Sequence, residues 1–452
     1  MNTIAAISTP LAVGGISVLR ISGDEAKSIA EKIFIPASGK KLRAVPGYSA
    51  HFGRVRDKNG DFDEGIATVF NAPKSYTGED VVEITCHGGI YITKRLLRAA
   101  ISAGAAPAQN GEFTKRAFLN GKMDLTAAES VMDLIAAQGE QAAKAAHMMS
   151  EGSLWQEVQG IKSVLIACNA HIAAFIDYPE DDVPQLKMDE IKRSVADCRS
   201  RLQELSDTFD RGRLMREGID TVIVGKPNVG KSTLMNLLSG CDRSIVTEIP
   251  GTTRDTVEET VQLGLVTLRL CDTAGIRDSD DIVEKIGIDR AKRRIETAQL
   301  VIAVFDSSKA LEPDDLELIE CCKGKLAIAV VNKTDLEPKL DLDMIGSVFP
   351  DVVQISALQR DSLDVLANAV ERQTKIAELD TSSAILSTER QKQCVEGCIS
   401  ALDEADKAIE TTTLDAVGVL LDDAIAEILS LTGERVTDAV VDEVFSRFCV
   451  GK

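Results

Sequence analysis

The pattern of apolar and polar positions divides the chain into segments of different texture. Residues 1–118 mix short β-like runs with glycine turns, as in GGISVLRISG and VVEITCHGG, and then a helical run, IYITKRLLRAAISAG. Short strands with such a helix predict an α+β domain. Residues 119–217 place Ala, Leu, Glu and Met at helical spacing, and only DYPEDDVP interrupts them with proline and charge. This second segment is therefore predicted to be helical.

A third texture covers residues 218–375, where β-branched runs alternate with helical ones. The apolar runs are DTVIVG, VTLRLCD, LVIAVFD, LAIAVVNK and DVVQISA. Strands that are apolar throughout and separated by helices predict a mostly parallel sheet covered on both faces. Helical texture returns over residues 376–452. Because neither helical segment resembles a complete domain, we expect one discontinuous helical domain into which the α/β domain is inserted.

The segment GKPNVGKST, residues 225–233, lies between a predicted strand and a predicted helix. That context supports a phosphate-binding loop of the form G-x-x-x-x-G-K-[ST]. Gly225 and Gly230 allow successive backbone N–H groups to face phosphate oxygens, and the helix adds its positive N-terminal end. We expect Lys231 to reach the β- and γ-phosphates and the Ser232 hydroxyl to ligate magnesium.

Four further motifs follow in the order expected of a guanine-nucleotide site. They are PGTTRD, DTAG, NKTD and SAL, at residues 250–255, 272–275, 332–335 and 356–358. The Asp335 carboxylate can accept hydrogen bonds from guanine N1–H and the exocyclic amine, whereas adenine would leave it unpaired. The backbone of SAL can cover the guanine oxygen. The set predicts a Ras-like P-loop G domain that binds GTP.

The first two of these motifs are expected to serve magnesium and the γ-phosphate. Asp272 ends a strand near the metal, and Thr252 and Thr253 can close on the γ-phosphate and magnesium as a switch. The residues that these motifs predict to contact GTP or its cations are Asn228, Val229, Gly230, Lys231, Ser232, Thr233, Pro250, Gly251, Thr252, Thr253, Asp272, Thr273, Ala274, Gly275, Asn332, Lys333, Thr334, Asp335, Ser356, Ala357 and Leu358.

In Ras-like proteins the residue after the glycine of DTAG is a glutamine that orients the attacking water. Here this residue is Ile276, which taken alone favours a very slow switch. Asn228 carries a carbonyl oxygen able to help bind a monovalent cation, and potassium beside the phosphates can supply the charge of an arginine finger. Glu284 can orient water once its loop is ordered. Lys231, Asp272 and Glu284 are thus the candidate catalytic residues for hydrolysis.

Composition and charge limit the partners and the compartment. The chain has 51 basic and 71 acidic residues, a net charge of −20, which argues against a surface that coats nucleic acid by charge alone. Ten cysteines include no C-x-x-C pair, so neither a zinc site nor a disulfide framework is predicted. The N-terminus lacks a basic signal-peptide region, and we expect no apolar run long enough to span a membrane. A reduced, cytoplasmic setting is the simplest interpretation.

Several motifs together resemble one family, the tRNA-modification GTPases of the MnmE (TrmE) type. The resemblance extends over nearly the whole chain, through LRISG, SYTGEDVVEITCHGG, GEFTKRAFLNGKMDLTAAE, GKPNVGKST, IVTEIPGTTRD, DTAGIRDSDDIVEKIGIDRA and the terminal FCVGK. It implies joint action with an FAD-binding partner in a heterotetramer. The two proteins would place an aminomethyl or carboxymethylaminomethyl group at C5 of the wobble uridine of certain tRNAs.

The resemblance also implies roles for particular residues. The N-terminal domain would dimerise and hold a tetrahydrofolate derivative, 5-formyl- or methylene-tetrahydrofolate, as the one-carbon source. Arg20, Glu83, Lys122 and Lys452 carry over as its ligands. In the G domain it implies potassium contacts from Asn228, Thr247, Ile249 and Thr252, and it places Glu248 of the same loop at the site. It also implies magnesium contacts from Ser232 and Thr253, and two G domains that meet face to face so that Glu284 engages.

The terminal segment FSRFCVGK, residues 445–452, raises its own question, because chain ends are usually frayed. The resemblance implies an ordered tail that reaches back to the folate site. Cys449 would then lie near the one-carbon donor, as a nucleophile or a modulator of the site.

Two other functions stay open from the sequence. One is a GTP-driven ribosome-assembly switch without chemistry beyond hydrolysis, which would be expected to carry a basic RNA-binding appendage. The region after the G domain instead includes the acidic LDDAIAEILS. The other is a folate-dependent transferase that its GTPase only regulates.

Overall fold

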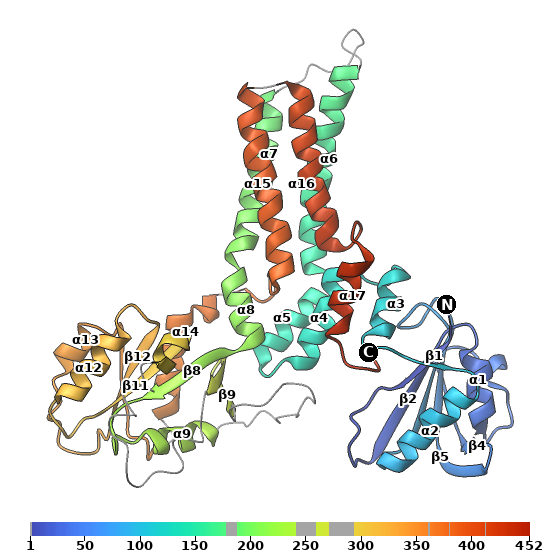
Figure 1. Cartoon of the computed structure of the whole chain (residues 1–452), viewed down its shortest axis with the longest axis horizontal. Helices are drawn as coiled ribbons and strands as arrows, with labels where there is room; N and C mark the ends of the chain where they lie inside the picture. The colour runs from blue at the N-terminus through green and yellow to red at the C-terminus, as the bar shows by residue number, and fades with distance from the viewer. Residues whose placement is uncertain are drawn as a thin grey trace. The chain divides into compact units, whose positions relative to one another are not determined.

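The structure is a computed structural model that describes residues 2–177, 188–240, 259–270, 293–359, 362–378, 380–411 and 413–452 (Figure 1). The chain forms two compact units. The first comprises Met1–Met132, Val158–Lys162 and Leu421–Lys452. The second comprises Asp133–Glu157 and Ser163–Leu420.

The first unit is built on a seven-stranded sheet of order β3-β4-β5-β6-β2-β1-β7. Neighbouring strands are antiparallel except β1 and β7, which are parallel. The strands are β1 (Ile4–Ile7), β2 (Ile16–Ser22), β3 (Phe34–Pro36), β4 (Ser49–Asp57), β5 (Gly60–Phe70), β6 (Val81–His87) and β7 (Ala106–Pro107). Helices α1 (Ala26–Ile33) and α2 (Ile90–Ser102) pack on this sheet and share its core, which confirms the predicted α+β domain.

Strand β1 is buried on both faces. Ala5 and Ile7 belong to the core under α1 and α2, whereas Ile4 and Ala6 pack with Phe113 on the other side. The alternation follows from the pleat, in which successive side chains point to opposite faces. Phe113 lies on α3 (Glu112–Leu119), so this helix covers the second face of β1.

Three helical segments of the first unit share a small aromatic core. Phe445 and Phe448, from and just after α17 (Asp438–Ser446), pack with Leu125 and Ala128 of α4 (Leu125–Ala136). Gly111 precedes α3 with φ +63°, and a Cβ there would lie 2.7 Å from the Phe445 carbonyl oxygen. The C-terminal helix is therefore fixed against the start of α3.

In the second unit, two long helices that precede and follow the α/β region in the sequence pair along their lengths. Helix α7 (Met188–Asp207) buries Val195 and Leu202, and α15 (Glu389–Thr411) buries Val395 and Leu402, each at a spacing of two helical turns. The ion pair between Arg199 and Asp403 crosses their contact. Segments on either side of the α/β region thus form one helical domain, as predicted. The second unit also contains α5 (Glu140–Ser150) and α8 (Phe209–Glu217), whereas α6 (Ser153–Asp177) and α16 (Leu414–Thr432) each have residues in both units.

Helix α6 is a long helix of high mean hydropathy. Its 25 residues include an 18-residue window of mean hydropathy 1.3, so by length and composition alone this helix could cross a membrane. One such helix is weak evidence, because core helices of soluble proteins pass the same test. The expectation that no apolar run spans a membrane therefore stays a prediction from the sequence.

The α/β part of the second unit is a six-stranded sheet of order β13-β12-β11-β8-β10-β9. Only the β9–β10 pair is antiparallel, which confirms the mostly parallel sheet. The strands are β8 (Ile219–Val224), β9 (Glu259–Leu263), β10 (Val266–Leu270), β11 (Leu300–Asp306), β12 (Ala327–Asn332) and β13 (Asp351–Gln354). The helices are α9 (Lys231–Ser239), α12 (Pro313–Cys322), α13 (Leu342–Gly346) and α14 (Ser362–Thr374).

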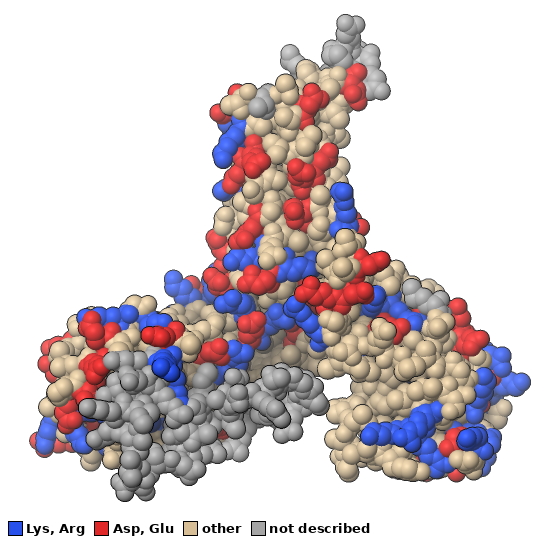
Figure 2. Space-filling model, in the orientation of Figure 1, with Lys and Arg blue, Asp and Glu red and all other residues tan. Residues whose placement is uncertain are grey.

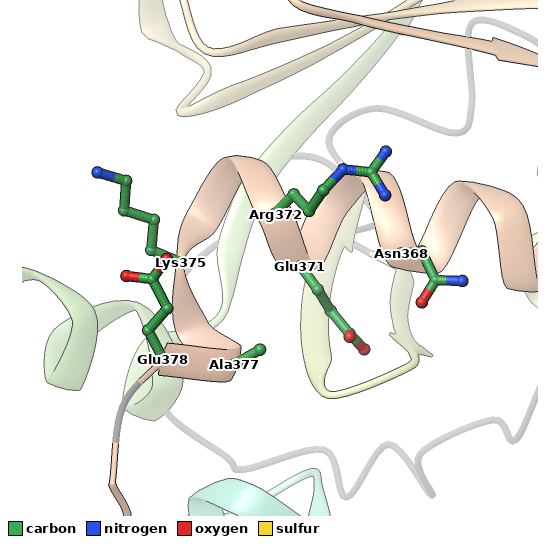
Figure 3. Close-up of a pocket in the computed structure, with 6 residues that line it drawn as sticks. All are labelled: Asn368, Glu371, Arg372, Lys375, Ala377 and Glu378. Atoms are coloured by element: carbon green, nitrogen blue, oxygen red, sulfur yellow. The ribbon is translucent and has the colours of Figure 1, made fainter.

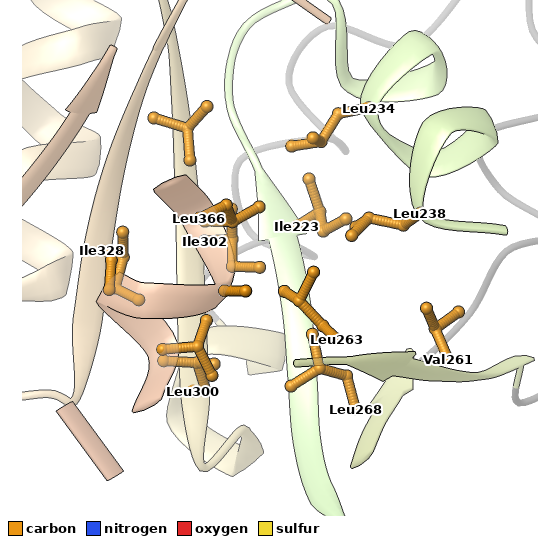
Figure 4. Close-up of a cluster of buried hydrophobic side chains, with 14 of the residues drawn as sticks. Ile223, Leu234, Leu238, Val261, Leu263, Leu268, Leu300, Ile302, Ile328 and Leu366 are labelled. Carbon is orange, nitrogen blue, oxygen red and sulfur yellow. The ribbon is translucent and has the colours of Figure 1, made fainter. Parts of the chain in front are cut away.

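Both faces of this sheet are covered, as its apolar strands predicted. Strand β11 is buried throughout and sends alternate residues into two clusters. Ile302 packs with Leu234 of α9 and Leu366 of α14 on one face (Figure 4). Val301 packs with Ile319 of α12 on the other.

We expect Leu366→Ala to destabilise the α/β part by about 2–5 kcal/mol, because it leaves a cavity under fully buried β11. Hydrogen exchange of β8 and β11 peptides, followed by mass spectrometry on the full chain, measures the loss. The neighbouring Val365→Ala is the control, since Val365 is 49% exposed on the same helix. Equal effects of the two substitutions would contradict the packing described.

Candidate functional site

The phosphate loop connects β8 to α9 and depends on two glycines. Gly225 has φ +152°, and a Cβ there would lie 2.4 Å from the Val304 carbonyl oxygen. Gly230, at φ +102°, caps α9, and its Cβ would lie 2.0 Å from Asn332 Nδ2. Asn228 also adopts a positive φ, +63°. The loop therefore curls tightly before the helix N-terminus, as an anion cradle requires.

Lys231 lies across this loop. Its Nζ donates to the carbonyl oxygens of Gly225 at 2.7 Å and Lys226 at 2.6 Å. Burial lowers the pKa of its ammonium, since the charge loses water and its partners among the described residues are neutral carbonyl oxygens. The adjacent Ser232 is exposed at the first turn of α9, where a metal-bound nucleotide can reach it.

Asn332 ties the predicted base-binding segments to the phosphate loop. This buried side chain, at the end of β12, donates from Nδ2 to the Val229 carbonyl oxygen at 2.9 Å. Its Oδ1 accepts from the Ala357 backbone N–H at 2.9 Å. Lys333 adds a bond from Nζ to the Asn228 carbonyl oxygen at 2.7 Å. The loops after β8, β12 and β13 therefore meet at one edge of the sheet.

Asp335 lies beside the segment predicted to cover the guanine. Its Oδ1 accepts from Ser356 Oγ at 2.8 Å, and the backbone N–H of Thr334 donates to the Ile355 carbonyl oxygen. The exposed carboxylate keeps acceptor capacity for a base, and Leu358 is 81% exposed next to it. This geometry suits an edge-on contact with guanine.

Other predicted residues lie outside the described part of the chain. They are Thr247, Glu248, Ile249, Pro250, Gly251, Thr252, Thr253, Asp272, Thr273, Ala274, Gly275, Ile276 and Glu284. The predicted switch, the magnesium-proximal aspartate and the water-orienting glutamate therefore stay predictions from the sequence.

A second cluster of predicted residues lies in the first unit. Arg20 of β2 and Glu83 of β6 face each other in register, with Arg20 Nε 2.8 Å from Glu83 Oε1. The Arg20 guanidinium also lies over the rings of Tyr76 and Phe113, 5.4 and 5.6 Å from their centroids. A paired charge with two aromatic neighbours can hold a flat, polar ligand.

The C-terminal tail reaches this cluster. The Gly451 carbonyl oxygen accepts from Ser8 Oγ at 3.1 Å and from Arg20 Nη1 at 3.5 Å. Phe113 N donates to the main-chain oxygen of Lys452 at 3.2 Å. Burial, followed by the nearby charge of Arg20, lowers the pKa of the Lys452 ammonium, while Glu83 opposes the shift. The structure thus places Arg20, Glu83 and Lys452 together.

The remaining two predicted residues of this region differ from that group. Lys122 donates from Nζ to the Pro73 carbonyl oxygen at 3.1 Å, and the described residues include no bond from it to Arg20, Glu83 or Lys452. Cys449 is exposed, and only its backbone takes part in the tail, accepting from Gly111 N at 3.4 Å. Tyr76 and Phe113, which the sequence reasoning missed, lie within the quoted segments SYTGED and GEFTK.

A separate cavity of about 270 Å³ lies along the C-terminal half of α14 (Figure 3). It is lined by Asn368, Glu371, Arg372, Lys375, Ala377 and Glu378. Glu371 already accepts from Leu265 N at 2.8 Å, and Arg372 pairs with Asp351 at 2.7 Å. These two charged groups are engaged within the fold, and the residues that line the cavity include none of the predicted site residues.

The sheet, the phosphate loop and the Asn332–Asp335 segment define the class of P-loop guanine-nucleotide-binding proteins. Two family models match the chain: "MnmE helical domain" over residues 125–449 and "GTP-binding protein TrmE N-terminus" over residues 3–122. The chain belongs to the tRNA modification GTPase MnmE family.

Full-length relatives agree with this assignment. The tRNA modification GTPase MnmE of Acetivibrio thermocellus is 40% identical over 458 residues, covering 100% of this chain and 99% of that protein. The protein of the same name from Bacillus pumilus is 40% identical over 459 residues and covers 100% of both chains. Among solved structures, the G domain of the T. maritima FeoB iron transporter is 28% identical, covers 35% of this chain and 98% of that chain, and gives a TM-score of 0.25.

We expect Gly451→Ala to displace the tail, because Gly451 has φ +98° and a Cβ would lie 2.3 Å from the Ile7 carbonyl oxygen. Hydrogen exchange of residues 445–452 should rise at least tenfold, as expected when about 1.4 kcal/mol or more of local stability is lost. Val450→Ala is the control, since Val450 is 53% exposed. Unchanged exchange in Gly451→Ala would show that the tail is not held through this residue.

Proposed function

We propose that the chain is a cytoplasmic, potassium-stimulated GTPase that acts with an FAD-binding partner. The pair would add a (carboxymethyl)aminomethyl group at C5 of the wobble uridine of certain tRNAs, using a tetrahydrofolate one-carbon unit. The coarser part, GTP hydrolysis in tRNA modification, follows from membership of the family. The observation that carries the finer part is the cluster of Arg20, Glu83 and the C-terminal tail, a second polar site in a unit without the phosphate loop.

The phosphate loop and its neighbours bind and orient GTP. The N–H groups of the loop and the N-terminus of α9 receive the phosphates. Lys231 exchanges its two carbonyl partners for phosphate oxygens. The Asp335 carboxylate accepts hydrogen bonds from the guanine N1–H and amine. The Ser356 hydroxyl donates to the same carboxylate and fixes its orientation. Magnesium supplies charge neutralisation at the phosphates, with Ser232 and Thr253 as ligands and Asp272 nearby.

Potassium is proposed to bind beside the phosphates. Asn228 is exposed at the crest of the loop, and Thr247, Ile249 and Thr252 would complete the contacts. A fixed cation there stabilises the charge that develops during hydrolysis. Glu284 would orient the attacking water when two G domains meet face to face. Lys333 holds the backbone of Asn228 and therefore supports this site.

The tetrahydrofolate derivative is proposed to bind at the Arg20–Glu83 cluster and supplies the one-carbon unit there. Glu83 can accept hydrogen bonds from a pterin amine and ring N–H, while Arg20 and Lys452 can meet carbonyl or carboxylate oxygens. The rings of Tyr76 and Phe113 flank Arg20 and favour a flat ligand. Lys122 is retained as a ligand that needs a side-chain movement, and Cys449 as a modulator.

The first unit also has features expected of a homodimer. Apolar side chains are well exposed on it, including Leu11 at 55%, Val13 at 86%, Ile16 at 68%, Phe52 at 56% and Ile66 at 43%. Such exposure is costly in water and favours a protein contact.

Over α7 and α15, acidic and basic side chains are interspersed on the side visible in Figure 2. We propose that the partner protein supplies much of the tRNA contact.

The main test is the tRNA of cells that lack this protein. We expect C5-aminomethyl-type uridines to vanish from nucleoside digests analysed by mass spectrometry, and to return with the wild-type gene. Asp272→Ala should not restore them, because hydrolysis needs the magnesium site, whereas the exposed Asp314→Ala on α12 should. Unchanged tRNA in the deletion strain would overturn the proposal and favour the ribosome-assembly switch.

The cation mechanism has its own test. GTP hydrolysis by the full chain should be at least tenfold faster in potassium than in sodium at equal ionic strength. Glu284→Ala should lose at least tenfold in rate and still bind GTP, as expected of a group that acts on water. Glu320→Ala, which removes an exposed acid of α12, should change neither. Equal rates in the two salts would exclude the potassium site.

A further inference from the structure

The second residue of the phosphate loop, Lys226, points away from the place that phosphates would occupy. Its Nζ lies 2.8 Å from Glu312 Oε2 and 2.6 Å from Asp315 Oδ2, at the start of α12. The Lys226 side chain is 15% exposed and that of Asp315 only 5%. A largely buried ion pair of this kind has a defined geometry, unlike exposed pairs.

The two acids are themselves fixed by the beginning of α12. Glu312 is the N-cap, and a reciprocal capping box joins its side chain and that of Asp315 to each other's backbone N–H groups. Asp315 Oδ2 accepts from Glu312 N at 3.0 Å as well as from Lys226. Lys226 is therefore attached to a rigid point of the fold rather than to a mobile side chain.

The backbone of Lys226 faces the catalytic side of the loop. Its carbonyl oxygen accepts from Lys231 Nζ at 2.6 Å. Two residues further on, the Asn228 carbonyl oxygen is held by Lys333, which is paired with Asp306 at 2.6 Å. The loop is thus attached at two points. Lys226 pairs with the acids at the start of α12, and Asn228 is held through Lys333 by Asp306 at the end of β11.

We propose that Lys226 is a positioning residue for GTP binding, which holds the phosphate loop in its receptive shape through the ion pair with Asp315 and Glu312. This inference rests on the proposed GTPase function. Loss of the pair lets the crest of the loop move, so nucleotide affinity and the potassium response decline. The chemical step is preserved once GTP and potassium are bound, because Lys226 touches neither reacting atom.

The test measures GTP and GDP dissociation constants, the half-saturating potassium concentration and kcat for the full chain. We expect Lys226→Met to weaken GTP binding about tenfold and to raise the potassium requirement, with kcat at saturation within about twofold. Lys226→Arg should retain most of the affinity, because it keeps the charge. Lys323→Met is the matched control: it removes a lysine paired with Glu320 at the other end of α12 and should change nothing.

A double-mutant cycle separates the ion pair from a general loss of structure. Asp315→Asn removes the charge but keeps an oxygen for the cap, and it should cause most of the loss in GTP affinity that Lys226→Met causes, because Glu312 still pairs with Lys226. The double variant should be no weaker than Lys226→Met alone, because the lysine substitution already breaks the interaction with Asp315. Should Lys226→Met fail to fold, Glu312→Gln removes the more exposed partner and should weaken binding about threefold.

The possible results distinguish this inference from the proposed function. Unchanged affinity in Lys226→Met, additive losses in the double variant, or a loss confined to kcat would each overturn the positioning role while the wild type still hydrolyses GTP. A wild-type chain that binds no guanine nucleotide would overturn the proposed function, and this inference with it.

Discussion

The buried amide of Asn332 is the interaction on which the nucleotide site depends. Strand β11 separates β8 from β12, so the two loops that carry the phosphate and base motifs start about 10 Å apart. Asn332 spans this gap by donating to the Val229 carbonyl oxygen and accepting from the Ala357 N–H. The same amide explains why position 230 requires a glycine, since a Cβ there would lie 2.0 Å from Asn332 Nδ2. An amide and a glycine far apart in sequence therefore constrain each other.

In the first unit, main-chain bonds play the corresponding role for the tail. Val450 pairs with Asn110 as a β-bridge, and Lys452 accepts from Phe113 N. These bonds begin where α17 ends, and the packing of Phe445 and Phe448 fixes that point. The tail is ordered because a hydrophobic anchor precedes it and backbone partners receive it. The positive φ of Gly451 lets its carbonyl oxygen turn toward Ser8 and Arg20.

The sequence predicted those features that periodicity or local motifs encode. Apolar runs such as LVIAVFD predicted a doubly covered sheet, and β11 is buried on both faces. The strand register that places Arg20 opposite Glu83 cannot be predicted from periodicity or a local motif, because the two residues are 63 positions apart in the sequence. The ion pair of Lys226 with Asp315 was missed for the same reason. Helix α6 lies in the segment that was predicted to be helical, but its high mean hydropathy was not anticipated, because polar residues interrupt its apolar runs.

The three lysines of the phosphate site show why one of them is able to meet the nucleotide. Lys226 is paired with two carboxylates and Lys333 with Asp306, whereas Lys231 contacts neutral carbonyl oxygens. Charge-assisted hydrogen bonds are roughly twice as strong as neutral ones, so an incoming phosphate displaces the partners of Lys231 at the lowest cost. Burial lowers the pKa of Lys231, and a polyphosphate bound at the proposed site would compensate that unfavourable desolvation. Two paired lysines thus hold the loop, and Lys231, whose partners among the described residues are neutral carbonyl oxygens, is the lysine that would be available to a phosphate at the proposed nucleotide site.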